Sequence, residues 1–213
     1  IASVRHLVVH PSFTSFDLDE LNALTSELEV HHLKPFEQEG VIAESNQHES
    51  EDTGRDQVVI FTSGTTGRPK GVRLSRRAYE VNAAVFEQLL GLEDGEPLRL
   101  VLVNPLYHAN STAMADMGLR RPNTDIVLIP RYSGRYWHHL TEACRGFEGR
   151  VVAPAVSRHF EFLDNLLSTS QIEMTAELDQ ALRRTRFLVG SAPVGPETLE
   201  RFMQRGICMN RIT

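Results

Sequence analysis

Several features are scarce in this 213-residue chain, and each scarcity argues against a class of protein. Its only two cysteines, Cys144 and Cys208, are far apart and lack CxxC spacing, which argues for a reducing cytosol and against a disulfide framework, although two cysteines can still pair. Basic residues number 22 against 28 acidic ones, and the net charge of −6 argues against a nucleic-acid-binding surface. No apolar run reaches membrane-spanning length, and the N-terminus has no signal-type core. We therefore expect a soluble, cytoplasmic protein with no membrane span.

Hydrophobic residues make up 41% of the chain and charged residues 23%, the balance of an ordinary globular protein. Segments with strand-like and helix-like patterns alternate along it, which predicts an α/β fold with a layered, largely parallel sheet flanked by helices. We expect strands at 4–9, 58–62, 98–106, 125–130, 150–155 and 187–190, and helices over 16–28, 75–90, 133–145, 157–168, 176–184 and 195–205. The apolar run VVIFT at 58–62 is typical of a strand buried inside a parallel sheet.

Capping residues sharpen some of these boundaries. Ser75 is a plausible N-cap for the helix over 75–90, and Gly91 is its expected stop. Ala78, Val81, Val85 and Leu89 share one face of that helix. Pro196 suits the first turn of the last helix.

Domain organisation is indicated by a polar and acidic stretch over 36–57, which we interpret as a solvated loop or linker. The chain then divides into an N-terminal segment with this acidic linker, residues 1–57, and an α/β domain, residues 58–213.

Residues 61–72, FTSGTTGRPKGV, form the most informative segment of the chain. Glycines allow tight turns and close approach of an anion to backbone amides, hydroxyl groups add donors, and Lys70 adds a positive charge. The spacing is not that of a Walker loop, in which lysine directly follows the last glycine. The composition predicts a polyphosphate-binding loop, with a flexible surface loop as the alternative. The candidate binding residues are Thr62, Ser63, Gly64, Thr65, Thr66, Gly67 and Lys70.

The complete string TSGTTGRPKG resembles the phosphate-loop signature of the adenylate-forming (AMP-binding) superfamily, of the acyl- or aryl-CoA synthetase type. NPLYHAN (104–110) resembles the second core motif of that family. The resemblance implies that His108 lies beside the substrate carboxylate and the α-phosphate. It also places Asn110, where many relatives have glycine, in the same substrate pocket.

A third segment, FLVGSAPVGPETLERF (187–202), resembles the strand, turn and helix that pack against adenine in this family. The resemblance implies that Gly190, Ser191, Ala192 and Pro193 contact the nucleotide. Without the resemblance, the same residues form an ordinary strand–turn–helix junction.

The resemblance implies an ATP-dependent ligase that converts a carboxylic acid to its acyl-adenylate and then to a thioester of CoA or of a carrier-protein thiol. Such a reaction depends on in-line positioning and on neutralising phosphate charge. Lys70 and His108 are the implied catalytic residues, and ATP, Mg²⁺ and CoA are the implied cofactors. No metal ligand is assigned to a residue of this chain.

The chain ends at ICMNRIT, before the YGxTE-like motif and the C-terminal lysine domain of the family. We therefore expect the central part of the large N-terminal domain, with an incomplete Mg²⁺ site and with the remainder of its own polypeptide as a partner. The isolated chain is then expected to be inactive. The alternative is a complete, non-catalytic nucleotide-binding or interaction module.

Overall fold

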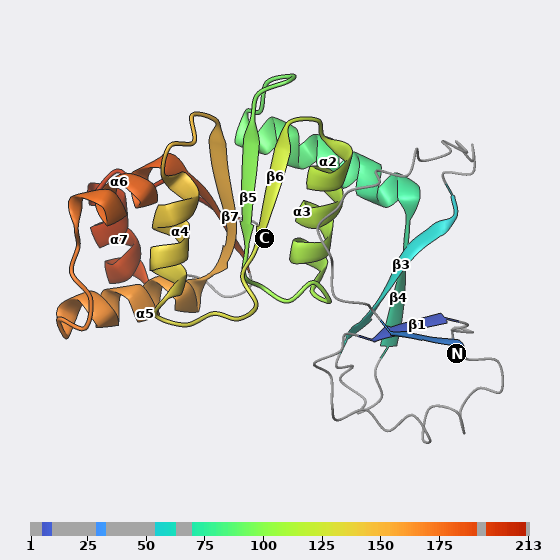
Figure 1. The fold of residues 1–213 in the computed structure, drawn as a ribbon, viewed down its shortest axis with the longest axis horizontal. Coiled ribbons are helices and arrows are strands. Elements are labelled where there is room, and N and C mark those ends of the chain that lie inside the picture. Colours follow the sequence, from blue (N-terminus) through green and yellow to red (C-terminus); the bar gives the residue numbers. More distant parts are fainter. Residues whose placement is uncertain (1–5, 10–28, 33–53, 63–69, 191–194, 212–213) are drawn as a thin grey trace. The chain divides into compact units, whose positions relative to one another are not determined.

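The computed structural model describes residues 6–9, 29–32, 54–62, 70–190 and 195–211 (Figure 1). The chain divides into two compact units, Ile1–Glu49 and Ser50–Thr213. In the first unit, β1 (His6–Val9) and β2 (Glu29–His32) pair in parallel, with Leu7 opposite Val30. The strand predicted at 4–9 is thus present. The predicted helix over 16–28 lies outside the described residues.

The second unit is built on a five-stranded sheet in the order β6-β5-β7-β8-β9, in which every described pairing is parallel. Its strands are β5 (Leu98–Leu102), β6 (Thr124–Leu128), β7 (Arg150–Val156), β8 (Thr185–Gly190) and β9 (Met209–Arg211). The predicted α/β class with a largely parallel sheet is confirmed.

Helices cover both faces of this sheet, as Figure 1 shows. One group is α2 (Arg76–Leu90) and α3 (Ala109–Arg120), and the other is α4 (Tyr136–Cys144), α5 (Ser157–Ser168), α6 (Ala176–Arg184) and α7 (Pro196–Gln204). Alternate residues of a strand point to opposite faces. Leu98, Leu100 and Leu102 of β5 accordingly pack with α2 and α3, whereas Val101 belongs to the core on the other face.

The predicted caps of α2 are confirmed in atomic detail. Ser75 Oγ accepts a hydrogen bond from the backbone N–H of Ala78 at 3.2 Å, and Gly91 adopts φ 60°, a left-handed conformation that suits glycine. Pro196 occupies the first turn of α7, as predicted. These short-range signals set the helix boundaries because capping depends on local hydrogen bonds.

The buried face of α2 is formed by Tyr79, Phe86 and Leu90. On the face predicted from the helical spacing, Val81, Val85 and Leu89 are 57%, 53% and 45% exposed. The helical spacing thus identifies an apolar stripe that lies at the surface. The face of α2 that packs against the core is the one with Tyr79, Phe86 and Leu90.

The interpretation of VVIFT as a buried strand of a parallel sheet is wrong. β3 (Asp56–Thr62) pairs in the antiparallel sense with β4 (Lys70–Ser75) as a separate two-stranded sheet. Phe61 is 64% exposed, so the apolar run does not mark burial on both faces.

Helix α3 has no counterpart among the predicted elements, although it contributes Met114 and Met117 to the core. Among the described residues, no helix is both long enough and apolar enough to cross a membrane.

Candidate functional site

The hairpin of β3 and β4 carries the predicted phosphate loop. Thr62, the last residue of β3, is paired with Lys70, the first residue of β4. The connecting residues 63–69, with the candidates Ser63, Gly64, Thr65, Thr66 and Gly67, lie outside the described residues. The connection leaves β3 at Thr62 and enters β4 at Lys70. Because these two residues are paired, the exposed Lys70 lies directly opposite Thr62.

Gly71 lets the two strands of this hairpin pack closely after Lys70. A Cβ atom at position 71 would lie 3.1 Å from Val59 Cγ1 and 3.2 Å from the Phe61 ring, closer than ordinary van der Waals contact. The side chains of β3 therefore occupy the space that a larger residue on β4 would need.

His108 is the N-cap of α3. Its backbone N–H donates to the carbonyl of Pro105 at 3.0 Å, and its own carbonyl accepts from the N–H and the hydroxyl of Thr112, each at 3.0 Å. Within the described residues the imidazole makes no capping hydrogen bond to the helix. The backbone of His108 is thus fixed by the helix start, while its ring is exposed and lies 4.6 Å from the ring of Tyr107.

A cavity of about 680 Å³ lies beside this helix start. That volume is typical of small-molecule sites. It is lined by α2, by the segment that follows β5, and by the carboxyl ends of β7 and β8. In parallel α/β sheets, ligands bind at the carboxyl ends of strands. The lining residues are Asn82, Val85, Phe86, Leu89, Asn104, Pro105, His108, Ala109, Asn110, Ser111, Ala113, Ala155, Val156 and Gly190.

The cavity brings together candidate residues from two separate sequence motifs. His108 and Asn110 come from the segment after β5, and Gly190 is the last residue of β8. Ser191, Ala192 and Pro193, which follow Gly190, lie outside the described residues. The described candidates therefore come from the hairpin of β3 and β4, from the start of α3 and from the end of β8. The candidates at the start of α3 and at the end of β8 line the same cavity.

The apolar wall formed by α2 was missed by the site prediction. Val85, Phe86 and Leu89 line the cavity, although the motifs contain no residue of this helix. The signal in the sequence was the helical spacing of Val81, Val85 and Leu89, of which Val85 and Leu89 line the cavity.

His159 is a buried residue that holds Val156, one of the residues lining the cavity. Its Nδ1 accepts a hydrogen bond from the N–H of Val156, a lining residue, at 3.5 Å, and its ring stacks on Tyr132 with the centroids 4.0 Å apart. Burial lowers the pKa of His159 to about 4, so the imidazole is neutral near pH 7. A neutral ring can accept the hydrogen bond that holds the end of β7 to the start of α5.

Metal binding has no support in the part of the chain that the structure describes. No group of three or more histidine, cysteine, aspartate or glutamate side chains is placed there to hold an ion.

Comparison with protein families gives a match to the model described as AMP-binding enzyme over residues 4–213. The long-chain fatty acid transport protein 3 of Homo sapiens is 30% identical over 147 residues, which are 68% of this chain and 19% of that protein. The mitochondrial medium-chain acyl-CoA ligase ACSF2 of Homo sapiens is 41% identical over 80 residues, 36% of this chain and 13% of that protein.

Among solved structures, a malonyl-CoA ligase in a ternary product complex with methylmalonyl-CoA and AMP covers 98% of this chain. Its TM-score is 0.69 at 20% identity, and the chain covers 41% of it. This likeness supports the fold. The chain spans about a fifth or less of the length of the curated human relatives named above.

Proposed function

Because the chain belongs to the AMP-binding enzyme family, we propose that it forms part of an ATP-dependent ligase that activates a carboxylic acid and transfers the acyl group to CoA or to another thiol. Two of the similar proteins are CoA ligases by name. The observation that carries the proposal is the single cavity lined by His108, Asn110 and Gly190, residues of separate sequence motifs.

In the first step of the proposed reaction, a carboxylate oxygen attacks the α-phosphorus of ATP. The bond between the α-phosphorus and the bridging oxygen breaks, and pyrophosphate leaves with its negative charge. Lys70 at the start of β4 neutralises charge on the departing phosphates together with the loop of residues 62–71. The imidazole of His108 donates a hydrogen bond to charge on the α-phosphate or the carboxylate.

In the second step, a thiolate attacks the acyl carbonyl and the bond to the AMP oxygen breaks. The cavity supports this chemistry by its mixed lining. Val85, Phe86 and Leu89 provide apolar surface for the acyl group, whereas Asn110 and His108 provide polar groups near the helix start. Gly190 leaves room for the adenosine side of the intermediate, and we assign the same role to Ser191, Ala192 and Pro193.

Mg²⁺ is expected in ATP chemistry of this kind. The described residues provide no cluster of ligands for it, so we assign none of them to the ion and derive no step from it. We also propose that residues 58–213 form part of the large ATP-binding domain of such a ligase. The protein is proposed to act in the cytoplasm.

The test is carboxylate-dependent release of pyrophosphate by the full-length protein, measured against a panel of fatty, aryl and amino acids. Release that requires both ATP and one class of acid supports the ligase. Nucleotide binding without release by any acid would favour a non-catalytic nucleotide-binding module. Absence of nucleotide binding would contradict both the ligase and that module, and would leave the interaction module.

A further inference from the structure

The hairpin of β3 and β4, here called the phosphate hairpin, is not part of the five-stranded sheet. Two strands alone are marginally stable, so contacts outside the hairpin must set its orientation. Val58 and Leu74 pack against the core beneath α2 and α3, and the N–H of Arg76 donates to the carbonyl of Arg55 at 2.9 Å. These contacts all lie at the end of the hairpin away from Thr62 and Lys70.

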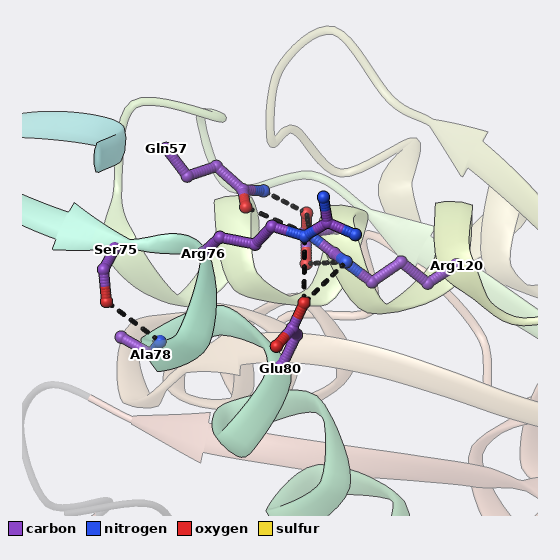
Figure 2. Close-up of polar contacts among 7 residues, drawn as sticks. Gln57, Ser75, Arg76, Ala78, Glu80 and Arg120 are labelled. Atoms are coloured by element: carbon purple, nitrogen blue, oxygen red, sulfur yellow. Dashed lines mark hydrogen bonds and ion pairs between the residues drawn. The ribbon is translucent and has the colours of Figure 1, made fainter. Parts of the chain in front are cut away.

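A hydrogen-bonded cluster at the same end joins the hairpin to α3, as Figure 2 shows. Gln57 on β3 donates from Nε2 to Asp116 Oδ1 at 2.5 Å, and its Oε1 accepts from Arg120 Nη2 at 3.0 Å. Arg120 Nε donates to the other oxygen of Asp116 at 2.7 Å. The amide, the carboxylate and the guanidinium thus close a ring, in which each group bonds to the other two.

Helix α2 joins the same cluster through a second carboxylate. Glu80 Oε1 lies 3.7 Å from Arg120 Nη1 and accepts from Arg76 Nε at 2.9 Å. Arg120 and Asp116 are only 33% and 14% exposed at their side chains, so solvent screens this pair less than a fully exposed one. One guanidinium therefore makes hydrogen bonds to side chains of β3 and α3 and an ion pair with α2.

The cluster connects two parts of the proposed site through rigid elements. Thr62 is five residues beyond Gln57 on β3, about 16 Å at the usual rise of a strand. His108 precedes Asp116 by eight residues, about 12 Å along α3. A tilt of about 5° at the base of the hairpin would move its end by about 1.4 Å, a displacement at which positional catalysis is already impaired.

We propose that Gln57, Asp116 and Arg120 are positioning residues that set the angle of the phosphate hairpin against α3, and thereby the placement of Lys70 relative to His108. This rests on the proposed function. A purely structural role gives a different expectation, because a loss of fold stability has no reason to affect one substrate more than the other.

The first test is Gln57→Ala in the full-length protein, which removes the link to the hairpin and leaves the Asp116–Arg120 pair intact. We expect kcat/KM for ATP, and the equilibrium affinity for a non-hydrolysable ATP analogue, to fall about tenfold or more. The KM for the carboxylate should stay within about twofold, because the cavity lining is not altered. Gln204→Ala is the matched control, since Gln204 makes a similar exposed bond to Glu200 at 3.2 Å on α7.

A rescue pair separates positioning from loss of a side chain. Gln57→Glu places two carboxylates side by side and should be as harmful as Gln57→Ala. Adding Asp116→Asn exchanges donor and acceptor between the two positions, so the ring can form again, and ATP affinity should return to within about threefold of the wild type.

The outcomes distinguish the two proposals. If the wild type neither binds ATP nor releases pyrophosphate, the proposed function fails and the positioning role with it. If the wild type is active but Gln57→Ala changes only the thermal transition, or the double variant gives no recovery, the positioning role alone is refuted.

Discussion

The buried imidazole of His159 makes the folded protein sensitive to acid, and the size of the effect follows from its environment. Burial lowers its pKa from the ordinary 6.5 to about 4, so the folded state keeps the ring neutral while the unfolded chain takes up a proton below 6.5. The contribution of this group is complete above pH 6.5 and is lost progressively as the pH falls toward 4. Linkage gives a loss of about 2 kcal/mol between about pH 7 and about pH 5, and about 3 kcal/mol in total.

The assay is denaturant unfolding of the full-length protein at both pH values, for the wild type and for His159→Asn. Asparagine retains an oxygen that can accept from the N–H of Val156 but does not titrate. The variant is expected to be less stable near pH 7, because it loses the stacking on Tyr132, and to lose about 2 kcal/mol less than the wild type on acidification. His138→Asn, at an exposed position on α4, is the control. Equal acid sensitivity of wild type and His159→Asn would refute the reasoning.

Two further substitutions test other parts of the account. Lys70→Ala in the full-length protein should lower the rate of pyrophosphate formation by about 10²-fold or more with an unchanged thermal transition, and unchanged turnover would remove Lys70 from the mechanism. Gly149→Ala should destabilise the fold by about 1–3 kcal/mol in denaturant unfolding, because a Cβ there would overlap the carbonyl oxygen of Pro97 and lie 2.7 Å from its carbon. Gly134→Ala, where the nearest atom is 3.7 Å away, should cost much less, and equal losses would contradict the packing argument.

Features that depend on local hydrogen bonds were predictable from the sequence. Ser75, Gly91 and Pro196 mark helix ends because their side chains or backbone conformations satisfy groups within a few residues. The strand–helix alternation likewise predicted the parallel sheet, since the chain must cross over between parallel strands.

Features that depend on tertiary context were not predictable in the same way. Helix α3 has His108 as its N-cap, but among the described residues this side chain makes no capping hydrogen bond, and Gly118 near the helix end is a weak helix former. Gly118 packs closely on the sheet, because a Cβ there would lie 2.6 Å from Leu100 Cδ1 and would force that side chain to shift. The sequence shows the glycine but not the strand that lies against it.

The candidate site also contains residues that the sequence indicated and residues that only the fold brings together. The family resemblance implied site roles for His108, Asn110 and Gly190, and the structure places all three at one cavity. The wall formed by α2 and the cluster around Gln57 come from segments far from those motifs. Apolar exposure and hydrogen-bond rings between distant residues become visible only once the fold brings the segments together.

The proposed reaction requires the cavity beside the start of α3 to hold the acyl group of the acid that reacts with ATP. This requirement is tested by a crystal structure of the full-length protein with a non-hydrolysable acyl-adenylate analogue. We expect the acyl group between α2 and Asn110, the phosphate mimic beside His108, and the adenosine at the Gly190 end of β8. An analogue bound at another site, with Val85 and Leu89 making no contact to it, would refute the proposed binding mode.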